Sequence, residues 1–318
     1  MSDHPWSGLR AAEKGTLDAR RADPQHRFDF FYAVNHEGDY LLLTRLPTLR
    51  CSSMDLPRLR GIDLRWLPDR SSLQLKLLSP QERDIFVLLC KDLMSATVAA
   101  ADDALCLTLL LTRLGKWQRL LSRGGPRLMS PNEVRGLVAE LLFLRDRLLP
   151  IFGPDSVVCW KGPLGFPQDF AVNGTVFEVK SHLTSSAQNI RISSAEQLWS
   201  EAPFLFLEVT YLAETTGDGV DLCSLVDEVA SELLASPVRA EQFEQLMAEQ
   251  GFLDLPEYRS QKFTVVDRET FRVEEGFPRI VPTAVPDGVQ DVRYAIEISA
   301  LSSFKCEVDW SSIRGDVK

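Results

Sequence analysis

Residues Asn173 and Gly174 stand between two apolar runs, and this pair constrains the fold more than any other short segment. Asn-Gly favours a two-residue turn in which both residues have positive φ, and such a turn joins two antiparallel strands. We therefore predict a β-hairpin with strands at Gln168–Val172 and Thr175–Ser181. A two-residue turn also fixes the cross-strand pairs. From the turn outward they are Val172–Thr175, Ala171–Val176, Phe170–Phe177 and Asp169–Glu178.

This register gives the hairpin two different faces, because alternate residues of a strand point to opposite sides. One face suits a hydrophobic core and carries Phe170, Val172, Phe177 and Val179. The other face places Asp169 directly opposite Glu178, with Lys180 and His182 further along the same side. Two like charges in such a pair destabilise a sheet. A divalent cation between the carboxylates would turn the repulsion into attraction, so the pair predicts a metal site.

Lys180 adds the positive charge that such a site needs for phosphate chemistry. It lies two residues beyond Glu178 on the same face, about 6.6–6.8 Å along the strand. Phosphodiester hydrolysis requires an activated water and a cation near the developing negative charge. These residues predict metal ligands at Asp169 and Glu178, and a Lys180 that orients the water and stabilises charge. The alternative is a solvated strand face with a surface ion pair.

Asp169 and the run Glu178-Val179-Lys180 resemble the PD-(D/E)xK signature that many restriction endonucleases and repair nucleases share. In the archetype the Pro precedes the Asp directly, whereas here Gln168 separates Pro167 from Asp169. The resemblance implies a restriction-endonuclease-like core in the order helix, three strands, helix, strand. The run from 136 to 198 also resembles a bacterial family of PD-(D/E)xK-motif proteins that are encoded beside restriction, methylation and phage-defence genes.

The resemblance also implies further site residues. Many members of the superfamily supply an additional metal-binding Glu from the first helix, and Glu140 is similar in position. Many use a Gln on the helix after the catalytic strands to support the site, which would be Gln197. Lys161, His182 and Arg191 border the motif and are candidates for contacts with a nucleic-acid backbone. Ordinary surface charge explains Lys161 and Arg191 equally well.

The activity that the resemblance implies is Mg²⁺-dependent endonuclease cleavage of DNA, with Mn²⁺ as a substitute, in bacterial restriction or anti-phage defence. The residues themselves do not exclude RNA. The implied partners are DNA, a second copy of the chain and an operon-encoded ATPase or methyltransferase. Two other functions stay open. One is a non-catalytic nuclease-fold scaffold or binding subunit in a defence complex, and the other is an enzyme that acts on another phosphate-containing substrate.

Helix signals surround the hairpin. A Ser followed by Glu three residues later forms a capping box, and this pattern occurs at 79–82, 130–133 and 193–196. The predicted helices are Pro80–Ala99, Leu105–Leu121, Ser130–Leu149, a short helix after Ser193, and Leu222–Leu234. Besides the hairpin, the predicted strands are Arg27–Val34, Tyr40–Leu46, Ile62–Leu67, Leu73–Leu78, Val157–Lys161, Asn189–Ile192 and Phe204–Leu212.

These elements predict a mixed α/β (α+β) protein in four segments. They are an N-terminal β-rich unit (1–78), a helical connector (79–126), the nuclease core (127–235) and a C-terminal extension (236–318). The boundary after the connector rests on the chain-breaking run Gly124-Gly125-Pro126.

Charge and composition argue against several other classes. The net charge of −10 does not suit a general nucleic-acid coat protein, because binding phosphates needs positive charge. The six cysteines are scattered singly and the four histidines form no ligand pair, so we expect no structural zinc site. No apolar run reaches the roughly 18 residues of a membrane span, and the N-terminus lacks the features of a signal peptide. We therefore expect a cytoplasmic protein.

Overall fold

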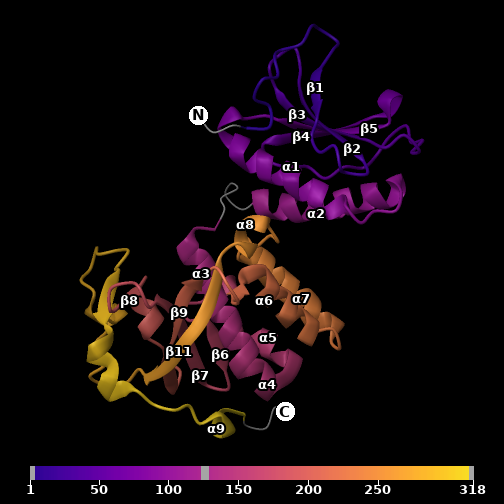
Figure 1. Ribbon diagram of the computed structural model, residues 1–318. Coiled ribbons are helices and arrows are strands. Elements are labelled where there is room, and N and C mark those ends of the chain that lie inside the picture. The colour runs from indigo at the N-terminus through magenta and orange to yellow at the C-terminus, as the bar shows by residue number, and fades with distance from the viewer. Residues whose placement is uncertain (1–3, 123–128, 315–318) are drawn as a thin grey trace. The chain divides into compact units, whose positions relative to one another are not determined.

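A computed structural model gives the structure of residues 4–122 and 129–314. The chain divides into two units, residues 1–128 and residues 129–318, and each has its own sheet and helices (Figure 1). The break expected at Gly124-Gly125-Pro126 lies outside the described residues. None of the helices in the described part of the chain is both long and apolar enough to span a bilayer.

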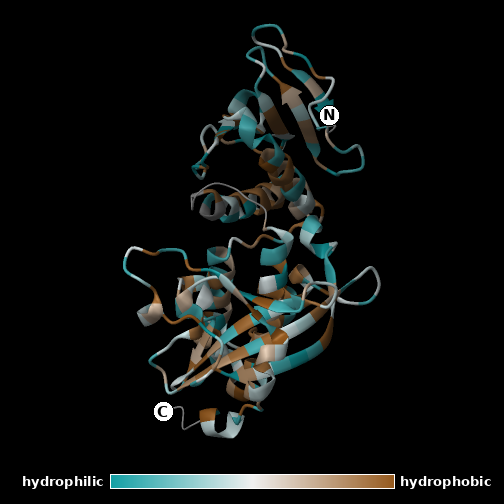
Figure 2. Ribbon diagram, turned by 90° about the vertical axis from the view of Figure 1, so that its left-hand side faces the viewer, coloured by the Kyte–Doolittle hydropathy of each residue, from teal (hydrophilic) through white to brown (hydrophobic). Residues whose placement is uncertain are grey.

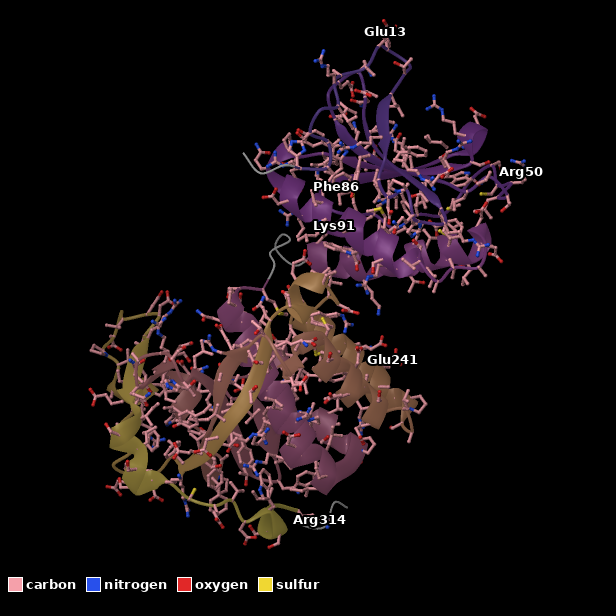
Figure 3. The ribbon with its side chains drawn as sticks, viewed as in Figure 1. Glu13, Arg50, Phe86, Lys91, Glu241 and Arg314 are labelled. Carbon is pink, nitrogen blue, oxygen red and sulfur yellow. The ribbon has the colours of Figure 1, made fainter. Side chains whose placement is uncertain are left out.

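The first unit is built on an antiparallel sheet in the order β1-β2-β3-β5-β4. Its strands are β1 Asp18–Arg21, β2 Asp29–Val34, β3 Tyr40–Arg45, β4 Ile62–Leu67 and β5 Ser72–Leu77. Four of them match predicted strands, and β1 is additional. Trp6 stacks on Phe86 of helix α1 (Arg83–Thr97) and meets Tyr32 of β2 edge-on. Helix α1 therefore covers one face of this sheet (Figure 3).

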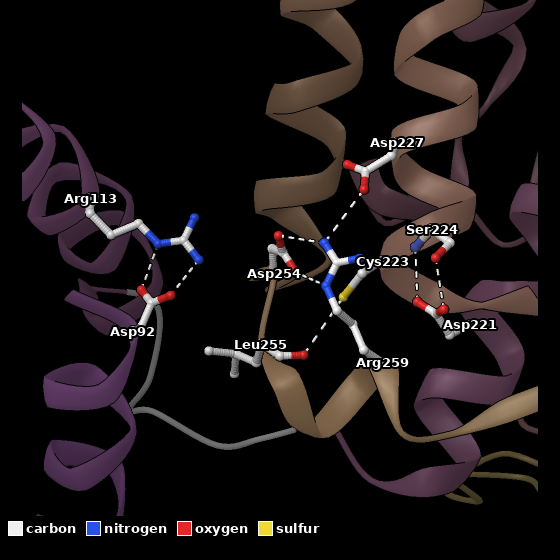
Figure 4. A network of polar contacts seen from close by, with 9 residues as sticks. All are labelled: Asp92, Arg113, Asp221, Cys223, Ser224, Asp227, Asp254, Leu255 and Arg259. Carbon is white, nitrogen blue, oxygen red and sulfur yellow. Dashed lines mark hydrogen bonds and ion pairs between the residues drawn. The ribbon is translucent and has the colours of Figure 1, made fainter. Parts of the chain in front are cut away.

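Helix α2 (Asp103–Ser122) packs on α1 around a buried carboxylate. Asp92 of α1 is 3% exposed and accepts hydrogen bonds from the guanidinium of Arg113 (Figure 4). It also accepts one from the indole N–H of Trp117. A buried charge is tolerated when it is paired and hydrogen-bonded in this way. The cluster therefore fixes how the two helices pack against each other.

The capping boxes at 79–82 and 130–133 have the same sequence pattern but different structures. Ser130 Oγ accepts a hydrogen bond from the Glu133 backbone N–H, and the Glu133 carboxylate accepts one from the Ser130 N–H at 2.8 Å. Helix α3 (Pro131–Phe143) thus begins at a complete box, as predicted. Ser79 instead donates to Gln81 Oε1, and a 3-10 turn precedes α1.

The second unit contains a mixed five-stranded sheet in the order β10-β11-β9-β7-β6. Its strands are β6 Phe170–Val172, β7 Thr175–Leu183, β9 Phe204–Thr215, β10 Val220–Asp221 and β11 Lys262–Arg272. Strands β7 and β9 are parallel, and the other neighbours are antiparallel. A separate two-stranded sheet pairs β8 (Asn189–Ile192) with β12 (Tyr294–Glu297). Strand β11, from the segment expected to extend the core, lies inside the main sheet.

Helices cover one face of this sheet. Helix α3 continues through a π-helical segment, Leu144–Leu148, into α4. The helices after α3 are α4 Leu149–Phe152, α5 Ser156–Cys159, α6 Leu222–Glu232, α7 Pro237–Glu249, α8 Pro256–Arg259 and α9 Trp310–Arg314. Arg259 of α8 pairs with Asp254 and Asp227, and Asp221 caps α6 by accepting from the Ser224 N–H (Figure 4).

The sheet of the second unit is buried on both faces. On the helical face, Phe143 of α3 packs on Phe170 and Phe177, with ring centroids 5.0 and 5.1 Å apart. On the opposite face, the β8–β12 pair and residues 298–304 pack on β9 and β11 in one apolar cluster. Figure 2 shows brown, apolar stretches beside teal, hydrophilic ones along the strands of this sheet. The apolar face predicted for the hairpin is the one that meets α3.

Two predicted elements of the core are wrong. Residues 157–159 of the predicted strand Val157–Lys161 belong to helix α5, and of the five only Trp160 makes a β-bridge, to Phe170. The 3-10 turn Gly153–Asp155 leads directly into α5, so local context overrides the strand propensity of this segment. The helix predicted after Ser193 is a single 3-10 turn, Ala195–Leu198. The observed order is therefore α3, the short helices α4 and α5, the β6–β7 hairpin, β8, a 3-10 turn and β9.

Candidate active site

The hairpin has the predicted turn, and its ladder is one pair shorter than predicted. Asn173 and Gly174 have φ of 46° and 77°. Three of the predicted pairs form, namely Phe170–Phe177, Ala171–Val176 and Val172–Thr175. The fourth does not, because Asp169 lies just before β6 and its Oδ2 accepts a hydrogen bond from the Val179 N–H at 2.7 Å. The Asp169 side chain thus takes the place of a strand carbonyl, and the predicted cross-strand pair with Glu178 is wrong.

Glu178 is the most buried carboxylate of the motif. It is 0% exposed, and its Oε1 lies 2.6 Å from the Nζ of Lys180, whose side chain is 17% exposed. Its Oε2 has no hydrogen-bond partner among the described residues. Burial, together with the negative charge of Asp169, raises the pKa of Glu178 to about 8 even though Lys180 opposes the shift. This burial excludes the alternative of a solvated strand face.

Asp169 and Glu140 complete a group of three acids. Burial raises the pKa of Asp169 to about 6, although Lys180 and the Val179 N–H favour its ionised form. Glu140, on α3, accepts a hydrogen bond at Oε2 from the indole N–H of Trp160 at 2.8 Å. Burial, and then the charge of Asp169, raise the pKa of Glu140 well above its usual range. The negative charge of Asp169 raises the pKa of both Glu178 and Glu140, so the three acids share one electrostatic environment.

Gln197 links Lys180 to the 3-10 turn after β8. Its Oε1 accepts hydrogen bonds from Lys180 Nζ at 3.1 Å and from the Ser193 N–H at 2.7 Å. Burial lowers the pKa of Lys180, but the charges of Glu178 and Asp169 outweigh burial and raise it. The lysine is therefore held as an ammonium by two acids and one amide oxygen.

The acids, Lys180 and Gln197 line one pocket of about 540 Å³ in the second unit. His182 and Arg191 also line it, whereas Lys161 does not. Lys161 contributes its backbone N–H, which donates to the Asp169 carbonyl oxygen at 2.7 Å. The other lining residues are Asn132, Arg135, Gly136, Val179, Ser181, Leu183, Ser186, Ala187, Asn189 and Ile190. The structure thus brings together every predicted site residue except the side chain of Lys161.

His182 and Arg135 form the end of the pocket away from the acids. His182 is 3% exposed, and its Nε2 has no hydrogen-bond partner among the described residues. Burial lowers its pKa. Arg135 of α3 donates to Ser181 Oγ at 3.3 Å and to Asn132 Oδ1 at 3.0 Å. The sequence pattern did not single out Arg135 as a site residue, although it lies five positions before Glu140 on the predicted helix.

A family model matches residues 2–299 of the chain. The family is DUF4420, described as "Putative PD-(D/E)XK family member". The chain belongs to the DUF4420 family. No curated protein and no solved structure matches it. Membership of DUF4420 supports a PD-(D/E)XK nuclease-like fold, and divalent metals are typical of that superfamily.

The donor set of this DUF4420 chain fits a divalent cation. Among the described residues no three His, Cys, Asp or Glu side chains are grouped so that they could already hold a metal ion, and Lys180 lies against Glu178. Glu178 Oε2 is nevertheless a buried oxygen without a hydrogen-bond partner. A Cβ added at Gly162 would lie 3.0 Å from Asp169 Oδ1 and 3.6 Å from Glu140 Oε2. The absence of a side chain at Gly162 therefore leaves an oxygen-lined space, and oxygen donors are the ligands that Mg²⁺ and Mn²⁺ prefer.

Proposed function

We propose that this protein is a metal-dependent nuclease that hydrolyses DNA phosphodiester bonds. The observation that carries the proposal is the buried Glu178, whose Oε2 has no partner and whose Oε1 pairs with Lys180. A fold gains nothing from a buried acid with one free oxygen, since an unsatisfied buried polar atom costs about 1–3 kcal/mol. Such a cost is typical of groups kept for binding or catalysis.

The acids would hold Mg²⁺, with Mn²⁺ as a substitute. Asp169 and Glu178 are the proposed ligands, and Glu140 completes or flanks the site. A bound divalent cation supplies Lewis-acid chemistry, because it polarises a phosphoryl oxygen and lowers the pKa of water. Trp160 orients the Glu140 carboxylate, and the main-chain N–H of Val179 orients that of Asp169.

Lys180 would act on the substrate side of these acids. Its ammonium is kept charged by Glu178 and Asp169, and Gln197 fixes its direction. A fixed cation that faces the reacting phosphate stabilises the negative charge that develops during hydrolysis. It also donates a hydrogen bond that orients the attacking water. Gln197 is thus a positioning residue, whereas Lys180 is a catalytic one.

DNA as substrate and a role in restriction or anti-phage defence rest on the resemblance to defence-associated PD-(D/E)xK proteins. A cytoplasmic location, a homodimer and an operon-encoded ATPase or methyltransferase as partner belong to the same proposal. His182 and Arg191, at the far end of the pocket, are proposed to contact the nucleic-acid backbone. The net charge of the whole chain is −10, so a local positive group such as Arg191 is necessary for binding phosphates.

The test compares wild type with Lys180→Ala in cleavage of supercoiled and linear DNA, each with Mg²⁺ and with EDTA. We expect cleavage by wild type with Mg²⁺ only, and none by the variant. Lys305→Ala is the matched control, because Lys305 pairs with Glu269 at the same 2.6 Å outside the pocket. Equal activity of wild type and a folded Lys180→Ala would refute the proposal. Parallel assays with RNA and with mononucleotides as substrates distinguish a DNase from an enzyme that acts on another phosphate-containing substrate.

A further inference from the structure

The two units carry opposite net charge. Residues 1–128 hold 19 Lys and Arg against 15 Asp and Glu, a net charge of +4. Residues 129–318 hold 16 against 30, a net charge of −14. A polyanion is repelled by a strongly negative surface and attracted by a positive one. The unit with the proposed nuclease site is thus the one that binds nucleic acid less readily by charge alone.

Positive charge in the first unit gathers at a pocket of about 560 Å³ on the sheet face opposite α1. Three exposed arginines line it: Arg45 at the end of β3, Arg50 in the following loop, and Arg70 in the turn before β5. None of the three forms an ion pair with any residue that the structure describes. Asp69 also lines the pocket and is exposed, so the lining keeps a positive net charge.

The strand register places an apolar floor beside these arginines. Phe31 of β2 pairs with Leu43 of β3, so the two side chains lie next to each other on the open face. Both are half-buried and both line the pocket. Arg45 follows Leu43 by two residues and therefore points to the same side. Arg50 lies at the edge of this unit in Figure 3, and its guanidinium approaches Ser71 Oγ at 3.5 Å.

We infer that this pocket, the arginine pocket, binds single-stranded nucleic acid. An aromatic ring beside unpaired arginines matches the two groups of a nucleotide, because a base stacks on Phe31 while the guanidinium groups bind phosphates. The bases of a duplex are stacked inside it and cannot reach a ring at the floor of a pocket. The site therefore favours an unpaired strand, and it would hold substrate on the first unit. It goes beyond the proposed cleavage and rests on different residues.

The experiment measures binding and cleavage separately. A fluorescent single-stranded DNA of about 15 nucleotides is titrated with the full chain. EDTA is present to remove metal. Fluorescence anisotropy gives Kd at several salt concentrations. The test variant is Arg45→Gln/Arg70→Gln. The matched control is Arg60→Gln/Lys91→Gln, which removes the same charge from exposed residues of the first unit outside the pocket. Phe31→Leu and Phe31→Trp test the ring.

We expect the Arg45/Arg70 variant to weaken binding at least about tenfold and to lower the slope of log K against log salt by about 1.4, or 0.7 for each phosphate contact. The control should change Kd by less than about threefold. Phe31→Leu should bind the single strand more weakly than wild type. Phe31→Trp, which keeps an aromatic ring, should bind it as tightly as wild type. Equal losses in the two double variants would overturn the inference, and so would a duplex that binds as tightly as the single strand. Cleavage with Mg²⁺ by a protein that does not bind in EDTA would refute this site alone, whereas binding without cleavage would refute the proposed nuclease alone.

Discussion

The indole N–H of Trp160 donates a hydrogen bond to Glu140 Oε2 at 2.8 Å. This contact joins the segment before the hairpin to helix α3, twenty positions earlier in the chain. The Trp160 ring itself contacts the rings of Phe170 and Phe243, with centroids 6.3 and 6.1 Å away. The direction of the Glu140 carboxylate is therefore set by an aromatic core and does not depend on solvent.

Trp160→Phe should weaken Mg²⁺ binding about 10–100-fold, the usual effect of removing a group that orients a metal ligand. The ring stays and the donor is lost, so the fold should persist. Trp117→Phe is the matched control, because it also removes an indole-to-carboxylate hydrogen bond, to Asp92, but in the first unit. Isothermal titration of each protein with Mg²⁺ gives the comparison. Equal affinities of the Trp160 variant and wild type would mean that Glu140 does not take part in metal binding.

Gly162→Ala should reduce metal binding and cleavage without unfolding the protein. Its methyl group would lie 3.0 Å from Asp169 Oδ1 and 3.6 Å from Glu140 Oε2, inside the oxygen-lined space. Gly136→Ala is the control, since a Cβ there meets nothing within 4 Å although Gly136 lines the same pocket. In the control, loss of a mid-helix glycine should stabilise the protein by about 0.5–1 kcal/mol. Thermal melts with EDTA and with Mg²⁺ measure both effects, and a Gly162→Ala protein with the full Mg²⁺ shift would contradict the assigned cation space.

The metal-free protein should lose stability as pH rises from about 4 to 8. Asp169 and Glu178 have pKa values of about 6 and about 8 in the folded chain, above their usual values near 4. A carboxyl with a raised pKa favours folding while it is protonated, and this contribution disappears as pH passes the folded-state value. Glu178→Gln should flatten the upper part of the decline. Melting temperatures in EDTA at each pH test this, and a steeper decline in the variant would show that Glu178 is not the group responsible.

Mg²⁺ should bind more tightly as pH rises over the same range, because the ligands must lose their protons first. Titration at one pH in two buffers with different ionisation enthalpies counts the protons released. We expect net release near pH 6.5 and little above pH 9. Binding with no proton release at pH 6.5 would contradict the raised pKa values of the acids.

Ser130→Ala should cost about 1 kcal/mol of stability. At the start of α3 the side chains of Ser130 and Glu133 each accept a hydrogen bond from the other's backbone N–H, and the substitution removes one of these bonds. Ser79→Ala should change stability by less than about 0.5 kcal/mol, since the Ser79 side chain caps no helix. Urea denaturation of the two variants tests the difference. A cost for Ser79→Ala equal to that for Ser130→Ala would show that the two boxes act alike in solution.

The hairpin could be predicted from the sequence because its determinants are local. Asn173 and Gly174 specify the turn, and the turn specifies the pairing of residues 170–172 with 175–177. The end of the ladder could not be predicted in this way. Asp169 leaves the strand because its carboxylate and its carbonyl bond to Val179, Lys161 and Gly162, and no local pattern in the sequence encodes that competition.

The burial of Glu178 was also beyond the sequence pattern. Alternation places Glu178 on the face opposite the apolar one but does not show what covers that face, and in the structure the β8–β12 pair lies on that side of the sheet. This pair joins residues 189–192 to residues 294–297, and neither segment has a strong signal for the other. Gly162 was missed for a similar reason, because its importance lies in the space that it leaves between Asp169 and Glu140.

Strand β9 is completed by a partner that is synthesised much later. Nine of its twelve residues pair with β7 on one side, whereas the other side pairs with β11, which ends at Arg272. At about 5–20 residues per second, the ribosome leaves this edge open for several seconds. An unpaired apolar strand edge is a template for association between nascent chains. The protein should therefore depend on chaperones during translation, and a chain cut between 215 and 262 should aggregate.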